Sequence, residues 1–202
     1  IKIEKRVGDN AERSELIAAL VLDKEVVHPM MPRKVEPARI ALLDAALEIK
    51  NTEIEAKIQI TDPAQLNSFF EQEERTLREM VEKVKASGAT VLFCQRGIDD
   101  LAQHFLAKAG ILAARRVKKS DLEKLSRATN AKIVSSWKEL SKDDLGAAGI
   151  VRADKVGKEE MIFVEKCLNP KAVTLLVRGG TEHVAEEIKR AVTDGIGDVA
   201  AA

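Results

Sequence analysis

Residues that could do chemistry are few and scattered along this chain of 202 amino acids. Gly179, Gly180 and Thr181 lie between an apolar run and an amphipathic one, where the N-terminus of a helix could bind an anion. Neither the Rossmann glycine spacing nor the Gly-Lys-Ser/Thr of a phosphate-binding loop accompanies them. A turn that needs positive φ is therefore favoured, and anion binding stays open as the alternative.

The histidines and cysteines do not form a recognisable catalytic or metal-binding pattern. His28, His104 and His183 are far apart, and none accompanies a serine or cysteine nucleophile in a known elbow motif. Cys94 and Cys167 lie in separate apolar, strand-like runs, without the close spacing of a zinc site. Two reduced thiols in the core of a cytosolic protein are favoured over a disulfide.

Carboxylates are abundant, but their positions are typical of a solvated surface. Residues 71–79 interleave glutamates with arginines, which favours i,i+4 ion pairs along one helix. The pairs Asp99-Asp100 and Asp143-Asp144 fall at predicted helix starts, where the helix dipole favours negative charge. Metal binding is the less favoured use of either pair.

Phe69 and Phe70 form the most informative apolar pair. Neighbouring residues on a helix point about 100° apart, so both are buried only if the helix is covered over a broad face. Except for Leu66, the flanking residues 65–68 and 71–74 are polar. From these residues alone, burial in a core and exposure to a partner both stay open.

The elements that must position these residues follow from hydrophobic periodicity. Strands are predicted at 15–23, 38–43, 53–60, 90–94, 111–117, 132–135, 161–164 and 172–177. Helices are predicted from the Thr61-Asp62-Pro63 start to 88, at 98–109, at 121–128 after a capping box of Ser120 and Glu123, and after Thr181. The alternation of strand and helix after residue 89 indicates an α/β fold with a mainly parallel sheet covered by helices. Residues 147–160 are extended, without a firm assignment.

Two of these helices have divided patterns. In the first, Glu73 and Glu74 interrupt the apolar stripe, so only the part from about residue 77 is predicted to dock on a body. In helix 98–109, two adjacent apolar faces are predicted to pack on the sheet; their members are Ala102, Leu106, Ala109, Leu101 and Phe105. Asp100, His104 and Lys108 share a third, polar face.

Composition sets the class of protein. An apolar content of 45% suits one good core with appendages. The 33 basic and 33 acidic side chains cancel, which argues against nucleic acid or an anionic membrane as a partner. The longest apolar run, residues 16–22, is too short to span a bilayer, and the charged N-terminus does not resemble a signal peptide. The first residue is not Met, and we expect a piece of a longer protein.

Several blocks of the chain carry a resemblance to one family. They are residues 1–5, 31–32, 41–43, 48–50, 60–63, 94–120, 161–165 and 181–184. In this order they resemble the apical, substrate-binding domain of the archaeal group II chaperonins, the thermosome subunits. The resemblance implies a β-sandwich-like core of the swivelling β/β/α type, flanked by helices. It also implies a helical protrusion at about 62–80, which forms a built-in lid over a folding chamber.

The resemblance implies a function and a division of the chain. Leu66, Phe69 and Phe70 would lie near the protrusion tip, and helix 98–109 would line the chamber with Asp100, His104, Phe105 and Lys108. Both surfaces would bind unfolded client polypeptides. Residues 1–14 would form a hinge at the edge of an intermediate domain, 15–180 the apical domain, and 181–202 a helix leading back.

The resemblance also bears on cofactors and partners. Full-length members are cytoplasmic ATPases that use ATP and Mg and assemble with other subunits in a ring. Their Gly-Asp-Gly-Thr-Thr phosphate loop is not in this chain, and Asp194 and Asp198 are not expected to activate water. We therefore expect no catalytic, cofactor or metal residue here. The alternatives are a small-molecule or nucleotide-binding domain that uses the Gly179-Gly180 turn, and a structural oligomerisation module.

Overall fold

The computed structural model describes residues 1–201 except 9, 50–62 and 170–172, and it describes 63–66 by their backbone only. The predicted strand 53–60 and the helix cap at Thr61 or Asp62 lie outside the described residues. The strands are β1 (Lys2–Val7), β2 (Glu15–Ile17), β3 (Ala19–Leu22), β4 (Lys34–Val35), β5 (Ala38–Leu43), β6 (Val91–Cys94), β7 (Leu112–Ala114), β8 (Ile133–Val134), β9 (Gly146–Val156), β10 (Glu159–Cys167) and β11 (Thr174–Gly179). The helices are α2 (Pro63–Ala86), α3 (Asp100–Lys108), α4 (Lys119–Thr129) and α5 (Glu182–Ala201), with short 3-10 turns at Ala11–Arg13, Trp137–Glu139 and Lys142–Asp144.

The strands form two sheets. The smaller has the order β1-β11-β2, and the larger has the order β3-β10-β9-β5-β6-β7, with β4 beside β9 and β8 beside β5. Strands β5, β6, β7 and β8 are parallel, whereas β3, β4, β9 and β10 join by antiparallel pairing. The α/β class with flanking helices is confirmed. The predicted parallel arrangement holds within the larger sheet for β5 to β8, so that sheet is mixed, and β11 pairs in parallel with β1 in the smaller sheet.

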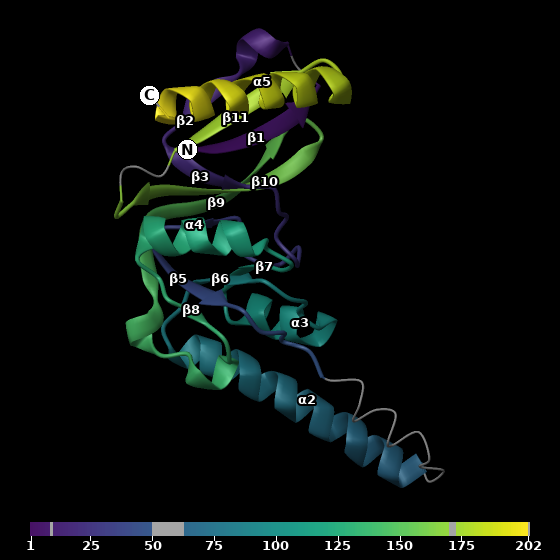
Figure 1. The fold of residues 1–202 in the computed structure, drawn as a ribbon. Coiled ribbons are helices and arrows are strands. Elements are labelled where there is room, and N and C mark those ends of the chain that lie inside the picture. Colours follow the sequence, from purple (N-terminus) through teal and green to yellow (C-terminus); the bar gives the residue numbers. More distant parts are fainter. Residues whose placement is uncertain (9, 50–62, 170–172, 202) are drawn as a thin grey trace.

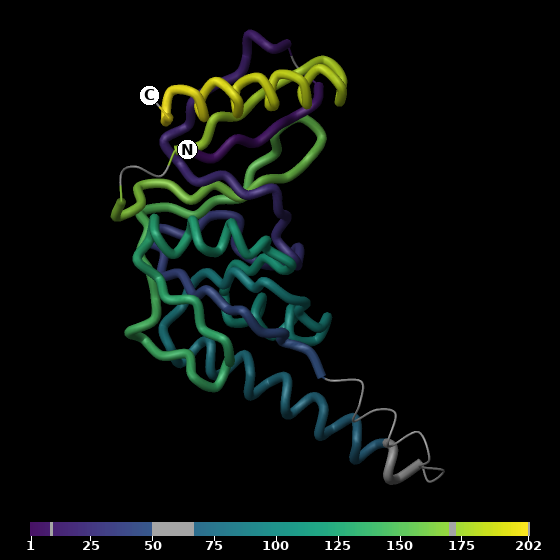
Figure 2. The backbone as a smooth tube through the Cα atoms, viewed as in Figure 1, coloured from purple at the N-terminus to yellow at the C-terminus, as the bar shows by residue number. Residues whose placement is uncertain are grey.

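The helices cover the sheets in separate layers. Figure 1 shows α5 across the smaller sheet at the end of the molecule where both termini lie. Helix α4 lies on one face of the larger sheet, and α3 lies on the other beside the inner part of α2. The outer turns of α2 extend away from the body, as the tube in Figure 2 shows.

Two predicted strands differ from the structure. The predicted strand 15–23 is interrupted at Ala18, because the chain passes from β2 in the smaller sheet to β3 in the larger one. The predicted strand 111–117 ends at Ala114, and Arg116 has a φ of 53°, which is incompatible with an extended strand. Residues 147–160, left unassigned from the sequence, lie mostly in β9 and in the turn to its antiparallel partner β10.

Two local predictions were wrong. The capping box of Ser120 and Glu123 does not form, since α4 begins at Lys119 with Lys118 as its N-cap. The first turn of this helix instead brings the carboxylate of Asp121 to 3.1 Å from the Lys2 ammonium. The predicted turn with positive φ does not form either, because neither Gly179 nor Gly180, both of which are described, has a positive φ. A Cβ at Gly179 would lie 2.6 Å from the backbone nitrogen of Ala185, so close packing of α5 requires this glycine.

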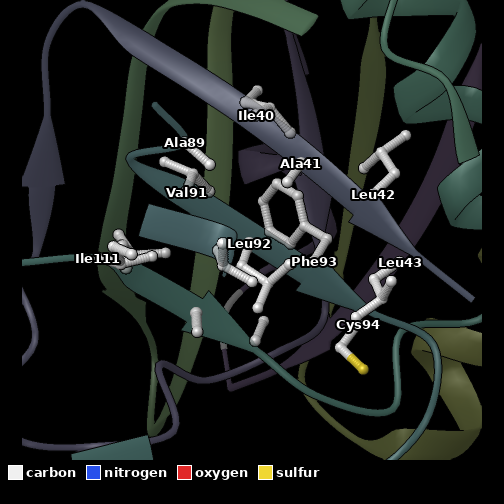
Figure 3. Close-up of a cluster of buried hydrophobic side chains, with 14 of the residues drawn as sticks. Ile40, Ala41, Leu42, Leu43, Ala89, Val91, Leu92, Phe93, Cys94 and Ile111 are labelled. Atoms are coloured by element: carbon white, nitrogen blue, oxygen red, sulfur yellow. The ribbon is translucent and has the colours of Figure 1, made fainter. Parts of the chain in front are cut away.

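The main core lies between the larger sheet and its helices. Figure 3 shows the neighbouring strands β5 and β6, where Ile40, Leu42 and Phe93 are completely buried. Helix α2 adds Leu77, Met80, Val81 and Val84 from its inner part, as its interrupted pattern predicts. A second cluster, with Val21, Val156, Met161, Phe163 and Leu176, joins the two sheets. Both helices that carry predicted site residues are therefore anchored at one side by a closely packed core.

Candidate functional site

Helix α3 is positioned by its cap and its buried face. The Asp99 side chain accepts a hydrogen bond of 2.9 Å from the backbone N–H of Leu101, which satisfies one of the free donors of the first turn. Ala102 and Leu106 are completely buried against the body. These contacts fix which side of the helix faces outward.

The rest of the predicted packing face needs a correction. Leu101 is 36% exposed, whereas Gln103 is buried. The amide nitrogen of Gln103 donates a hydrogen bond of 2.9 Å to the carbonyl oxygen of Ile98, so this polar side chain is satisfied inside. The packing face therefore includes Gln103 and leaves Leu101 at the surface.

The outward side of α3 brings together the four site residues predicted on this helix. Asp100 and Lys108 are exposed, and His104 and Phe105 are half-buried. Because positions three and four apart share a helix face, Leu101 lies beside His104, Phe105 and Lys108. We call these five residues the α3 surface.

Two further elements contact the α3 surface. The His28 ring lies 5.9 Å from that of His104, measured between centroids, and Met30 beside it is 73% exposed. The backbone N–H of Met30 donates a hydrogen bond of 3.2 Å to Nδ1 of His28. Sequence reasoning missed this loop as part of the site, since its closely spaced prolines give no periodic signal.

Helix α2 supplies the second contact. The Arg78 guanidinium carbon lies 4.5 Å from the centroid of the Phe105 ring, a cation–π arrangement. Arg78 also pairs with Glu74 at 2.7 Å, so part of the predicted i,i+4 ion pairing forms. This contact holds Phe105 at the junction of the two helices.

The other predicted site residues lie on the outer part of α2. Phe70 is 57% exposed and Phe69 is half-buried, with 6.0 Å between their ring centroids. The side chain of Leu66 lies outside the described part of the structure. The predicted residues thus form two groups, one on outer α2 and one on α3.

The described residues do not suggest a reactive centre. Burial raises the pKa of the Cys94 thiol to about 11, and its sulfur donates a hydrogen bond of 2.9 Å to the carbonyl oxygen of Ala45. Within the described ranges, no group of three or more His, Cys, Asp or Glu is arranged to hold a metal ion. In the same part of the chain, no helix is both long and apolar enough to cross a membrane. Large apolar side chains of this region, Met30, Phe70 and Leu101, are exposed.

Comparison with known proteins identifies the family. Residues 1–202 match the model of the TCP-1/cpn60 chaperonin family. The chain is 61% identical over 202 residues to thermosome subunit beta of Archaeoglobus fulgidus and 60% identical to a thermosome subunit of Methanopyrus kandleri; each comparison covers all of this chain and 37% of the relative.

A solved structure agrees with this match. The open-state monomer of a group II chaperonin from Methanococcoides burtonii has a TM-score of 0.81 and 46% identity, over 96% of this chain and 42% of that chain. The resemblance of the sequence blocks to the archaeal group II chaperonins is therefore confirmed at the level of the family. This chain, which spans 37% of the length of those two thermosome subunits, belongs to the TCP-1/cpn60 chaperonin family.

Proposed function

We propose that this chain is the client-binding, apical part of a group II chaperonin subunit, which holds exposed apolar segments of unfolded polypeptides. The observation that carries the proposal is the exposure of large apolar side chains beside a complete core. Phe70 is 57% exposed, Leu101 is 36% exposed and Met30 is 73% exposed. The charged side chains of Asp100 and Lys108 are exposed on the same helix as Leu101. Such apolar side chains can be covered by a client.

Binding would come from many weak contacts. Each square ångström of apolar area buried on a client contributes roughly 25 cal/mol, so a few side chains hold a segment only weakly. Several copies in a ring would raise the effective concentration of sites and hence the overall affinity. Asp100, His104 and Lys108 would add polar contacts around Phe105.

The proposal extends to the regions predicted from the family resemblance. The part of helix α2 that falls in the predicted protrusion of about 62–80 would close the folding chamber as a lid. Residues 1–14 and 181–202 would connect the apical domain 15–180 to an intermediate domain. The cytoplasmic parent would use ATP and Mg and assemble with other subunits, and this chain alone would not hydrolyse ATP.

A capture assay tests client binding. A chemically unfolded protein is diluted into buffer with the chain in excess, and its aggregation is followed by light scattering. We expect Phe70→Ser and His104→Ala to suppress aggregation less than the wild type, at unchanged melting temperature. His183→Ala on α5 is the matched control, because His183 is exposed and distant in sequence from both the α3 surface and the outer part of α2. Equal suppression by all four proteins would contradict the proposal.

The rival functions have their own measurements. A ligand that binds only the native state raises its melting temperature, so a saturable rise with Mg-ATP would favour a nucleotide-binding domain. Self-association of the chain without client, measured by static light scattering, would favour a structural oligomerisation module. We expect neither result.

A further inference from the structure

A pocket of about 370 Å³ is lined in part by Val27, the residue before His28, whose ring contacts His104 of the α3 surface. Its walls come from residues 23–27 after β3, residues 115–116 after β7, and residues 159–160 at the start of β10. Both acidic and basic side chains line it, and they differ in whether they are already paired within the chain.

Four carboxylates line the pocket, and three of them are committed to internal partners; the fourth, Glu25, is exposed and has no ion pair among the described residues. Asp23 accepts a hydrogen bond of 2.7 Å from Arg6, and Glu159 pairs with the same guanidinium. Partial burial raises the pKa of Asp23, but Arg6 outweighs it and the pKa is lowered, so the carboxylate is charged at neutral pH. Glu160 accepts a hydrogen bond of 2.9 Å from the backbone N–H of Val26 and also pairs with Arg33.

The cations of the pocket are not committed in this way. Arg115 and Arg116 are exposed, Lys24 is half-buried, and no carboxylate among the described residues lies within 4.0 Å of any of the three. Arg116 has a φ of 53°, an uncommon conformation for a residue other than glycine. Neighbouring side chains of an extended strand point to opposite faces, yet both arginines line this pocket. The backbone bend after β7 therefore places both arginines along the pocket.

We infer that this pocket binds a carboxylate of the client polypeptide, from an acidic side chain or a chain terminus; the inference rests on the proposed client-binding function. Guanidinium groups bind carboxylates and phosphates through paired hydrogen bonds. Attraction to the arginines and repulsion by the carboxylates of the same walls both grow with the charge of the ligand, so charge alone does not choose between a carboxylate and a phosphate. The choice rests on the neighbouring loop, in which Val27 lines the pocket and His28 contacts His104 of the proposed client surface. A peptide carboxylate is thus the favoured occupant.

The position of the pocket allows one client segment to reach both surfaces. Val27 lines the pocket, and its backbone N–H donates a hydrogen bond of 3.1 Å to the carbonyl oxygen of Ala113 in β7. The next residue, His28, contacts His104 of the α3 surface. Consecutive Cα atoms lie about 3.8 Å apart, so a short extended segment spans from one surface to the other. Clients with an acidic residue a few positions from an apolar stretch would bind best.

The experiment compares two fluorescent peptides by anisotropy. Both have the same apolar stretch, and one ends in two glutamates where the other has two glutamines, each with an amidated terminus. We expect the acidic peptide to bind the wild-type chain about three- to tenfold more tightly, with a preference that falls as salt is added. Arg115→Gln combined with Arg116→Asn should abolish the preference, since Asn tolerates the conformation of residue 116. Arg127→Gln, at an exposed arginine of α4 outside the pocket, is the control that should keep it.

Each outcome has a separate meaning. Equal affinity of the two peptides for the wild type, or a preference that survives the double substitution, would overturn the carboxylate site while leaving client binding intact. Failure of both peptides to bind would instead contradict the proposed function. Inorganic phosphate that competes with the acidic peptide more strongly than acetate does, at matched ionic strength, would overturn the choice of carboxylate over phosphate.

Discussion

Two leucines of α3 with opposite environments test the orientation of this helix. Leu106 is completely buried, whereas Leu101 is 36% exposed. Truncation of a buried leucine removes transfer free energy and leaves a cavity, so Leu106→Ala should lower the free energy of unfolding by about 2 to 5 kcal/mol. Leu101→Ala should change it by less than about 1 kcal/mol. Urea unfolding followed by circular dichroism measures both, and equal losses would mean that the helix is rotated.

The pKa of Cys94 leads to a prediction about alkaline pH. Burial raises this pKa from 9.0 to about 11 in the native chain. Between these two pH values the thiol keeps its proton in the native state and loses it in the unfolded state. Stability from this thiol is therefore complete below pH 9 and is lost as the pH rises towards about 11. Cys94→Ala should unfold at a lower urea concentration at pH 7, yet lose less stability than the wild type between pH 8.5 and 10.5. Parallel pH profiles of the two proteins would contradict this.

At the scale of elements, α2 should have two halves of different stability. Every side chain from 67 to 76 is exposed or half-buried, whereas Leu77, Met80, Val81 and Val84 are buried. An isolated helical segment is marginal in water, so the outer half lacks the packing that would hold it. Amide hydrogen exchange followed by mass spectrometry should be at least about tenfold faster at 67–74 than at 79–86. Equally slow exchange in both halves would show that the outer half is packed.

The sequence predicted these elements to different degrees. The interrupted stripe at Glu73 and Glu74 correctly divided α2, and strand 38–43 matches β5, because continuous apolar runs reflect burial directly. β9 was not assigned as a strand, because its glycines, alanines and charges do not alternate and its pairing with β10 decides its structure. The loop at His28 was likewise missed as part of the site, since only tertiary contact brings it to His104.

At the scale of the whole molecule, the sheet order could not be derived from local pattern. β5 pairs with β6, β8 and β9, which are far from it in the sequence, and no periodicity encodes such partners. The split of 15–23 between two sheets has the same origin. The family resemblance correctly implied an α/β architecture with flanking helices, because it rests on many blocks in one order. The exposure of Leu101 could not be predicted from the sequence, because it depends on how α3 packs against the rest of the molecule.

One buried ammonium connects the two sheets and gives the last prediction. Lys2 of β1 is 4% exposed, and its Nζ donates a hydrogen bond of 2.6 Å to the carbonyl oxygen of Val21 in β3. It also lies 2.8 Å from Glu4 and 3.1 Å from Asp121 of α4, which is itself buried. Removal of one partner from a buried ion pair leaves an uncompensated charge, so Lys2→Met should lower the free energy of unfolding by about 3 to 5 kcal/mol.

A double-mutant cycle shows whether this loss comes from the pair with Asp121. Replacement of a whole buried pair by apolar residues is often nearly neutral, so Lys2→Met with Asp121→Leu should cost well below the sum of the single substitutions. Urea unfolding measures the four proteins. The surface pair of Arg190 and Glu187 on α5, 3.0 Å apart, is the control and should show a coupling of less than about 1 kcal/mol. Additive losses at Lys2 and Asp121 would mean that the carbonyl oxygen of Val21 and Glu4 hold the ammonium, and that α4 is joined to β1 by apolar packing alone.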